Sequence, residues 1–388
     1  MPKLLLINGP NLNRLGFRDP ETYGSTTMAE LEELCRGWAG SVGFDLEAMQ
    51  SNHEGDLIDA IQQHGADGIV INPGAFTHYS YALHDALADS PLPSVEVHIS
   101  NIKEREAWRA NSVVSAACLS TIYGRGIKGY ADGIYRLAAH LEMPATTHTF
   151  GPDPDQVGDL RVPAPNSPVM VFLHGGFWRH QWTRDLMDRL AVNVAKAGWA
   201  SWNIEYRRVG TGGGWPTTAV DVGLAIDHLA VLSEDHTLDL SRVVLVGHSA
   251  GGQLALWAGS RGHRTSMSPG ADPLVPATDV IGLAPISDLR GARSLSDGAV
   301  DQFLASARTH TDVYREASPI DFIPVGVNQI IVHGTADTDV PVEQSQAYAR
   351  AARQAGDAVV YHEFDNVDHM TLIDPASEAW QTALDALT

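Results

Sequence analysis

Three side chains in the second half of the chain have the types and the order that nucleophilic catalysis by serine requires. Ser249 is the centre of Gly247-His248-Ser249-Ala250-Gly251, a G-x-S-x-G pattern whose small flanking residues permit a sharp strand-to-helix turn. Asp337 and His369 follow in that order, each after a predicted strand. This order predicts attack by Ser249, with His369 as the base and Asp337 as the acid that orients it. Asp339 is a near alternative to Asp337.

A glycine pair upstream predicts the groups that would stabilise the oxyanion of such a reaction. The segment His174-Gly175-Gly176-Phe177-Trp178 follows a predicted strand. Backbone N–H groups on a loop of this kind stabilise negative charge that develops on a carbonyl oxygen. We therefore expect the oxyanion hole to consist of the N–H groups of Gly176, Phe177 and Ala250. We expect His248 and His333 to have structural roles.

A different set of polar residues follows the predicted strands of the first half. In an open α/β sheet, ligands bind beyond the carboxyl ends of the strands, so these residues are expected to meet. Amides, histidines, arginines and one tyrosine suit a small, oxygenated, anionic ligand. The segments are Asn8–Arg14 with Arg18 and Tyr23, Gln50–Gly55, Asn72–His78, and Glu96–Asn101 with Arg105 and Arg109.

The elements that must position this first set alternate between short β-rich runs and helical patterns. The helix between the first two runs carries Leu31, Leu34, Trp38 and Val42 at three- and four-residue spacing, and a hydroxyl residue among Ser25–Thr27 offers its N-cap. Five strands separated by helices predict a parallel, flavodoxin-like α/β sandwich. The predicted strands are Lys3–Ile7, Phe44–Gln50, Gly68–Asn72, Ser94–Ile99 and Ser120–Tyr123.

A proline-rich stretch, Glu142–Ser167, interrupts the alternation and predicts a linker around 142–150. We place the domain boundary between residues 1–145 and 146–388. The second domain shows an α/β alternation again, with a helix at Ala219–Leu232 and a small helical insertion at Asp288–Pro319. The predicted strands of this half are Val169–Leu173, Ala200–Glu205, Arg242–Val246, Val280–Ala284, Gln329–Val332 and Ala358–Glu363.

The polar blocks of the first half resemble the signature blocks of type II 3-dehydroquinate dehydratase. These blocks are Asn-Gly-Pro-Asn-Leu-Asn, Gln-Ser-Asn-His-Glu-Gly, Asn-Pro-Gly-Ala-Phe-Thr-His and Glu-Val-His-Ile-Ser-Asn, and they occur in the same order. The resemblance covers residues 1 to about 141. It implies trans elimination of water from 3-dehydroquinate through an enolate, a step of the shikimate pathway and of aromatic amino acid biosynthesis.

The resemblance also implies a role for each matched residue. Tyr23 would remove the C2 proton and Arg18 would stabilise its phenolate, because a free tyrosine is almost fully protonated at neutral pH. His98 would protonate the departing hydroxyl, with Glu96 orienting its ring, and Asn11 would hold the water that stabilises the enolate. The residues implied to bind substrate are Asn72, His78, Asp85, Ile99, Ser100 and Arg109. Among these, Asp85 would reach the site of a neighbouring subunit, because family members assemble from trimers, usually as dodecamers.

The second half resembles the α/β-hydrolase esterases related to hormone-sensitive lipase and kynurenine formamidase. H-G-G-[FY]-W and G-H-S-A-G-G recur in that branch, and a match to H-G-x-x-D-x-x-V-P favours Asp337 over Asp339. The resemblance covers about 150–388. Few residues precede Val169, so we expect the usual first strands of this fold to be reduced. An ester, a lactone and a formamide all remain open as the substrate.

The charge and composition of the chain disfavour some classes of binding partner. The chain has 26 basic and 47 acidic residues, a formal charge of −21 that disfavours nucleic acid and anionic lipid. Two cysteines, no long apolar run and no signal-peptide pattern favour a reduced, cytoplasmic setting without membrane contact. Gly124–Gly129 matches G-x-G-x-x-G but lacks the acidic residue about 20 positions on, so a glycine turn is the better interpretation. We expect neither a cofactor nor a metal.

These observations favour a bifunctional homo-oligomer in which a dehydratase precedes an esterase-like serine hydrolase. A second hypothesis keeps only the dehydratase active, with the hydrolase half serving assembly or interaction. A third treats the front half as a flavodoxin-like binding module and the chain as chiefly an esterase or formamidase. The Tyr23, Arg18 and His98 set weighs against the third hypothesis, and the order of the triad weighs against the second.

Overall fold

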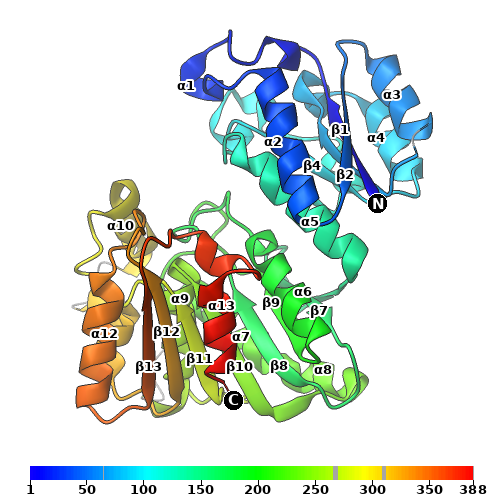
Figure 1. The fold of residues 1–388 in the computed structure, drawn as a ribbon. Helices are drawn as coiled ribbons and strands as arrows, with labels where there is room; N and C mark the ends of the chain where they lie inside the picture. The colour runs from blue at the N-terminus through cyan, green and yellow to red at the C-terminus, as the bar shows by residue number, and fades with distance from the viewer. Residues whose placement is uncertain (64, 265–269, 308–311, 388) are drawn as a thin grey trace. The chain divides into compact units, whose positions relative to one another are not determined.

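Two units, Met1–Pro144 and Ala145–Thr388, make up the chain in the computed structural model (Figure 1). The structure describes residues 1–63, 65–264, 270–307 and 312–387. Each unit has its own β-sheet and its own buried core.

The first unit is built on a five-stranded parallel sheet of order β2-β1-β3-β4-β5. This order confirms the predicted flavodoxin-like α/β sandwich, and the strand bounds differ from the predicted ones only at the ends. The strands are β1 Lys3–Asn8, β2 Asp45–Gln50, β3 Gly68–Asn72, β4 Ser94–His98 and β5 Ser120–Tyr123.

Helices cover both faces of this sheet, and β1 shows why. Leu4 and Leu6 point into the core beneath α2 and α5, whereas Leu5 and Ile7 point into the core beneath α3 and α4, because successive side chains of a strand face opposite sides. Burial on both faces explains the continuous apolar run of β1. The helices are α1 Pro20–Tyr23, α2 Met28–Ser41, α3 Glu54–Gln63, α4 Tyr81–Asp89 and α5 Lys128–Glu142.

The start of α2 is fixed by a capping box. The Thr27 side chain accepts a hydrogen bond from the backbone N–H of Glu30, and the Glu30 carboxylate accepts one from the backbone N–H of Thr27. The buried stripe of this helix is Leu31, Cys35 and Ala39. Leu34, expected in that stripe, lies exposed.

The second unit is built on an eight-stranded sheet of order β13-β12-β11-β10-β8-β9-β7-β6. Its strands are parallel except for β6 and β7, which pair antiparallel with each other, and β7 pairs antiparallel with β9. The strands are β6 Thr146–Thr149, β7 Val157–Arg161, β8 Pro168–Leu173, β9 Ala200–Ile204, β10 Asp239–His248, β11 Asp279–Leu283, β12 Asn328–Gly334 and β13 Val359–Phe364.

The prediction that the first strands of this sheet are reduced was wrong, and the linker predicted around 142–150 is shorter, because the boundary between the units lies at Pro144 but β6 already begins at Thr146. β6 and β7 form an antiparallel pair at that position, and α5 continues to Glu142. β6 lies at the sheet edge with three of its four residues exposed, so its sequence shows no apolar run. The prolines 152 and 154 lie in the connection between the two strands rather than in a strand.

Helices also cover both faces of the second sheet. α6 and α13 pack with one set of core residues, and α7, α8, α9 and α12 pack with the other. The predicted helix Ala219–Leu232 is divided at His228 between α7 and α8. The predicted helical insertion contains α10 and α11 within its described part. The helices are α6 Asp188–Lys196, α7 Thr217–Asp227, α8 Leu229–His236, α9 Ala250–Gly259, α10 Ala299–Phe303, α11 Val313–Ala317, α12 Glu343–Gln354 and α13 Glu378–Asp385.

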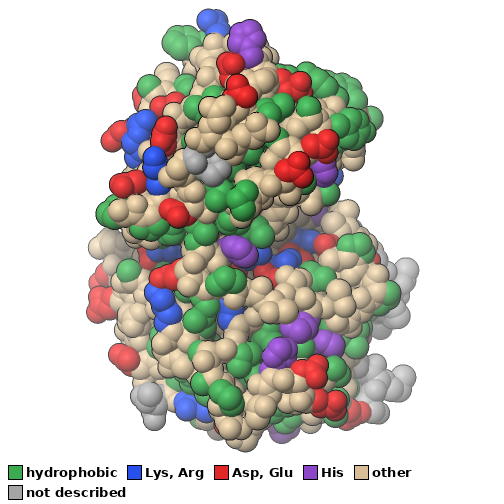
Figure 2. Space-filling model, turned by 90° about the vertical axis from the view of Figure 1, so that its right-hand side faces the viewer, with side chains coloured by type: hydrophobic (Ala, Val, Ile, Leu, Met, Phe, Trp, Pro, Cys, Tyr) green, Lys and Arg blue, Asp and Glu red, His purple; other side chains and the backbone are tan. Residues whose placement is uncertain are grey.

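On the face drawn in Figure 2, acidic and basic side chains are interspersed with polar and apolar ones on both units. Across the part of the chain that the structure describes, no helix combines the length and the apolar character needed to cross a bilayer.

Candidate active sites

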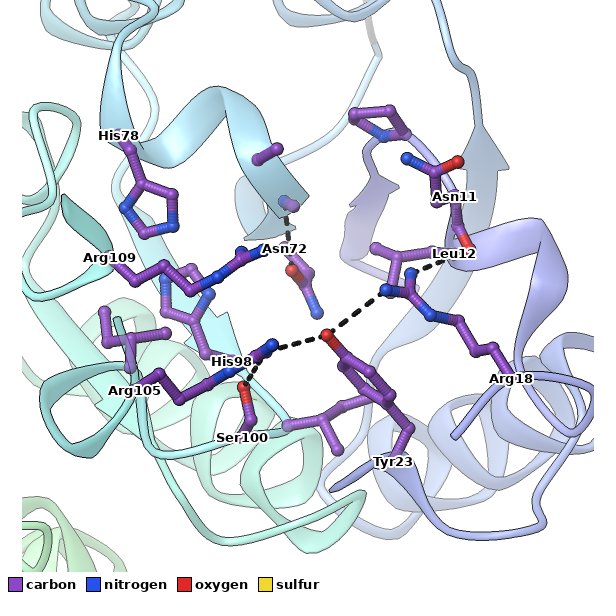
Figure 3. Close-up of a pocket in the computed structure, with 15 residues that line it drawn as sticks. Asn11, Leu12, Arg18, Tyr23, Asn72, His78, His98, Ser100, Arg105 and Arg109 are labelled. Atoms are coloured by element: carbon purple, nitrogen blue, oxygen red, sulfur yellow. Dashed lines mark hydrogen bonds between the residues drawn. The ribbon is translucent and has the colours of Figure 1, made fainter. Parts of the chain in front are cut away.

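The hydroxyl group of Tyr23 lies between two guanidinium groups in the first unit (Figure 3). Nη1 of Arg105 donates to this hydroxyl oxygen at 2.8 Å, and Nη2 of Arg18 donates to it at 3.3 Å. The Arg18 guanidinium also lies 4.3 Å from the centre of the tyrosine ring. Two positive charges at this distance can stabilise negative charge on the oxygen. A phenolate can act as a general base.

His98 lies at the end of β4 with one ring nitrogen engaged by a buried carboxylate. Its Nε2 atom lies 2.8 Å from Oε1 of Glu96, and Glu96 is fully buried. Burial alone raises the pKa of Glu96, but hydrogen bonds from His98, Ser112 and Thr121 outweigh burial and leave that pKa below its ordinary value. A carboxylate only accepts hydrogen bonds, so Nε2 carries a proton and Nδ1 is the nitrogen left for proton exchange.

Most of the residues predicted for this site line one pocket at the carboxyl ends of β1, β3 and β4 (Figure 3). Glu96 lies behind His98 rather than in the pocket wall, whereas Asp85 lies on the exposed face of α4, away from the pocket. The predicted residues in the wall are Asn11, Arg18, Tyr23, Asn72, His78, His98, Ile99, Ser100 and Arg109.

Arg105 is the charged residue in the pocket wall to which sequence reasoning assigned no role. It contacts both the Tyr23 hydroxyl and, at 3.3 Å, Oγ of Ser100. The available signal was its place in the segment that follows β4, four residues before Arg109. That signal does not say which of the two arginines reaches Tyr23. Arg109 instead pairs with Glu106 at 2.9 Å and stacks over Trp108.

Ser249 in the second unit occupies the turn between β10 and α9 with φ 57° and ψ −119°. This positive φ is rare for a residue with a side chain and marks a strained turn that projects the serine outward. A Cβ atom on Gly251 would lie 2.1 Å from the carbonyl oxygen of Leu173, so only glycine fits there. The second glycine of the G-x-S-x-G pattern is thus required by backbone packing against β8, and the first, Gly247, by the carbonyl oxygen of Gly251, which a Cβ atom would approach to 2.1 Å. Ser249 is buried, and its Oγ has no hydrogen-bond partner among the described residues.

Asp337 and His369 form a close pair, at 2.6 Å between Oδ2 and Nδ1. Burial alone raises the pKa of Asp337, but hydrogen bonds from His333 and His369 outweigh it and lower that pKa well below its ordinary range. Asp339 is exposed, and its backbone N–H donates to Asp337. Of the two acids that the sequence left open, the structure therefore brings Asp337 to His369. Asp337, Asp339 and His369 offer ligand atoms within 4.8 Å of one another, and the Asp337–His369 bond is also the kind of contact that a catalytic triad contains.

Two further histidines hold this pair from behind. Nε2 of His248 donates to the backbone carbonyl of His369 at 3.0 Å, and the two rings lie 4.3 Å apart. Burial lowers the pKa of His248 far below its ordinary value, so its ring is neutral. Nε2 of His333 lies 3.1 Å from Oδ2 of Asp337. Both contacts fix groups that act in acid–base chemistry.

The loop after β8 lies beside Ser249, since a Cβ atom on Gly175 would be 3.0 Å from the Ser249 Cβ atom. Phe177 has a positive φ of 51°, as does Gly176 at 104°. His174, the first residue of this loop, is held in place by a buried carboxylate. Its Nε2 lies 2.8 Å from Oε1 of the buried Glu205.

The two units match different families of known proteins. Residues 2–138 match the family model described as Dehydroquinase class II, and residues 159–351 match the BD-FAE family model. A 3-dehydroquinate dehydratase of Rhodopseudomonas palustris (strain BisA53) is 51% identical over 149 residues, which cover 37% of this chain and 99% of that protein.

Two solved structures resemble the larger part of the chain. The bifunctional GH43-CE protein of Bacteroides eggerthii has a TM-score of 0.53 and 21% identity, over 61% of this chain and 34% of that one. A butyrate-bound esterase of Thermogutta terrifontis has a TM-score of 0.51 and 21% identity, over 63% of this chain and 91% of that one. At this identity the likeness shows the fold alone, an α/β-hydrolase fold.

Proposed function

The chain belongs, through residues 2–138, to the class II dehydroquinase family, and from this premise we propose that its first unit converts 3-dehydroquinate to 3-dehydroshikimate by trans elimination of water through an enolate. The observation that carries the proposal is the Tyr23 hydroxyl held between Arg105 and Arg18 at the wall of the pocket. A phenolate there would be a base strong enough to remove the C2 proton of the substrate.

The second half of the elimination needs an acid, and His98 fits that role. The Glu96 carboxylate holds Nε2 of the ring at 2.8 Å, which leaves Nδ1 to deliver a proton to the departing hydroxyl. Glu96 would orient the ring through this bond. We assign to Asn11 the water that stabilises the enolate oxygen.

The remaining polar wall residues would bind the substrate. Arg109 supplies a positive charge for its carboxylate, while Asn72, His78 and Ser100 supply hydrogen bonds to its oxygens. The backbone N–H of Ile99 lies in the same wall and would bind the carboxylate as well. All of these groups are polar or charged, which suits a small, hydroxylated acid.

We further propose that the chain works as a homo-oligomer based on trimers, with the exposed Asp85 reaching the pocket of a neighbouring copy. Asp85 lies on α4 away from its own pocket, so only another copy could give it the role assigned from the family resemblance. Light scattering of the full chain tests the assembly. A trimer or a multiple of trimers supports it, and a monomer that dehydrates substrate at full rate contradicts it.

For the second unit we propose serine hydrolase activity of the esterase type, which makes the chain bifunctional. The Asp337–His369 pair at 2.6 Å, which contacts His248 immediately before Ser249, carries this proposal. His369 would take the Ser249 proton as Oγ attacks a carbonyl carbon, and the N–H groups of Gly176, Phe177 and Ala250 would stabilise the oxyanion.

Hydrolysis of a p-nitrophenyl ester tests this activity directly. The wild-type chain should release p-nitrophenol, and S249A should not, while both proteins dehydrate 3-dehydroquinate equally. Equal hydrolysis by S249A would exclude Ser249 as the nucleophile. A wild-type chain that dehydrates its substrate but hydrolyses no p-nitrophenyl ester, formamide or lactone would favour the hypothesis of a single active unit.

A further inference from the structure

The side-chain amide of Asn72 is held in one orientation at the floor of the dehydratase pocket. Asn72 is the last residue of β3 and is 3% exposed. Its Oδ1 atom accepts a hydrogen bond from the backbone N–H of Gly74 at 3.1 Å. A backbone N–H can only donate, so the oxygen of the amide must face Gly74 and the nitrogen must face the other way.

The nitrogen of this amide donates to a tyrosine on the helix behind the sheet. Nδ2 of Asn72 lies 2.8 Å from the hydroxyl oxygen of Tyr130, which is fully buried on α5. The Tyr130 hydroxyl donates its own proton to Oδ1 of Asn8 at 2.8 Å. Asn8 and Asn72 are paired neighbours on β1 and β3, so one hydroxyl ties both strand ends to α5.

The direction of this hydrogen-bond chain follows from its two ends. Gly74 fixes Asn72 as the donor to Tyr130, and Tyr130, having accepted one bond, must donate to Asn8. Burial raises the pKa of Tyr130, so the hydroxyl keeps the proton that it donates. One hydrogen of the Asn72 amide remains after these bonds. Figure 3 shows the Asn72 side chain pointing into the pocket.

We propose that Tyr130 is a positioning residue of the dehydratase site, whose hydroxyl fixes the Asn72 amide so that an N–H, and never the amide oxygen, faces the pocket. Asn72 then selects a hydrogen-bond acceptor at that position of the substrate, a hydroxyl or carboxylate oxygen. This inference rests on the proposed dehydratase function. Tyr130 does not touch the substrate, since it lies behind the sheet and outside the pocket wall.

Kinetics of the full-length Y130F variant test this role. Without the Tyr130 hydroxyl, the Asn72 amide loses one of the two hydrogen bonds that orient it. We therefore expect KM for 3-dehydroquinate to rise about tenfold, which corresponds to the free energy of about one hydrogen bond. The turnover number kcat should change less than about threefold, because the contact acts on bound substrate and transition state alike. Y135F, which changes another tyrosine of α5 outside the pocket wall, is the matched control and should keep KM within about twofold.

A double-mutant cycle separates positioning from a structural role. In the N72A background, Y130F should raise KM no further, because the amide that Tyr130 holds is gone. Additive increases in KM, or an unchanged KM in Y130F alone, would overturn the inference. If Y130F does not fold, the N8L/Y130F variant replaces both buried partners with apolar side chains and serves instead. Its KM must also rise about tenfold.

The wild-type chain distinguishes failure of this inference from failure of the function on which it rests. A wild-type chain that turns over no 3-dehydroquinate would overturn both. An active wild type whose KM equals that of Y130F would overturn the inference alone and leave the dehydratase in place.

Discussion

Nη1 of Arg105 lies 2.8 Å from the hydroxyl oxygen of Tyr23, although the two residues are 82 positions apart in the sequence. Tyr23 ends α1, which follows β1, and Arg105 follows β4. Because β1 and β4 flank β3 in a parallel sheet, the segments after them lie at the same edge. The pairing of the Tyr23 hydroxyl with a guanidinium is thus a product of strand order.

Loss of the Arg105 charge should impair dehydration. In R105M, one of the two positive charges at the Tyr23 hydroxyl is gone, so negative charge that develops on this oxygen is less stabilised. We expect kcat/KM to fall roughly 10- to 100-fold. R105K, which keeps the charge, should lose less. A kcat/KM of R105M that equals the wild-type value would show that Arg105 does not act on the base.

Removal of the Tyr23 hydroxyl should abolish dehydration without affecting the second unit. Y23F keeps the ring, with its stacking on Arg18, and deletes only the oxygen that takes the proton. We expect kcat for 3-dehydroquinate to fall at least about 100-fold. Hydrolysis of a p-nitrophenyl ester by the same preparation is the internal control and should be unchanged. Substantial dehydration by Y23F would remove Tyr23 from the role of base.

The first unit shows where sequence reasoning succeeds and where it stops. Its fold followed from strand and helix periodicity, because buried parallel strands such as β3 are continuous apolar runs. The wall residues followed from their positions at strand ends. The role of Arg105 did not follow, since Arg105 and Arg109 are close in sequence and only tertiary contacts decide which one reaches Tyr23. The contact of Tyr130 with Asn72 could not be predicted either, because in the sequence a buried tyrosine on a helix has the same pattern as an ordinary core residue.

The carboxylate of Asp337, and not that of Asp339, should be required for hydrolysis. D337N removes the charge that holds Nδ1 of His369 at 2.6 Å, and in a triad such a change costs about 10⁴-fold in kcat. D339N is the matched control, because Asp339 is exposed and touches Asp337 only through its backbone. Ester hydrolysis by the two variants decides between the acids. A large loss in D339N, with D337N active, would reverse the assignment.

The buried Glu205 should make the second unit less stable in acid. Burial alone raises the pKa of Glu205, but Arg208, His174 and Arg184 outweigh it and lower the pKa to about 2. A carboxyl whose pKa is lowered by folding contributes its full stabilisation at a pH above its pKa in the unfolded chain, about 4.3. It loses that contribution as the pH falls toward its pKa in the folded protein.

This linkage is measured as a difference between two proteins. Thermal unfolding of wild type and E205Q should differ most at pH 6, and the difference in Tm should shrink as the pH falls to 3, because the uncharged amide of the variant lacks the contribution at every pH. Carboxylates common to both proteins cancel in this difference. E234Q, at an exposed position, should match the wild type throughout. A Tm difference that stays constant from pH 6 to pH 3 would contradict a charged Glu205.

In the second unit, the sharp turn at Ser249 followed from the G-x-S-x-G spacing, and the choice of Asp337 and His369 followed from their order along the chain and from the strands that precede them. The first two strands did not, because β6 is an exposed edge strand without an apolar run. The His174–Glu205 contact joins residues 31 positions apart and depends on β8 and β9 being neighbours in the sheet. The sequence of either strand alone therefore does not predict this contact.

The most direct test of the central claim is the ultraviolet absorbance of 3-dehydroquinate mixed with the purified full-length chain. The product is a conjugated enone acid, so dehydration raises the absorbance. We predict that protein treated with borohydride in the presence of 3-dehydroquinate, and then freed of both, still gives this rise with fresh substrate, because an enolate route forms no imine on the protein that borohydride could reduce. No rise from folded protein would contradict the dehydratase function, and a rise that borohydride abolishes would contradict the enolate mechanism.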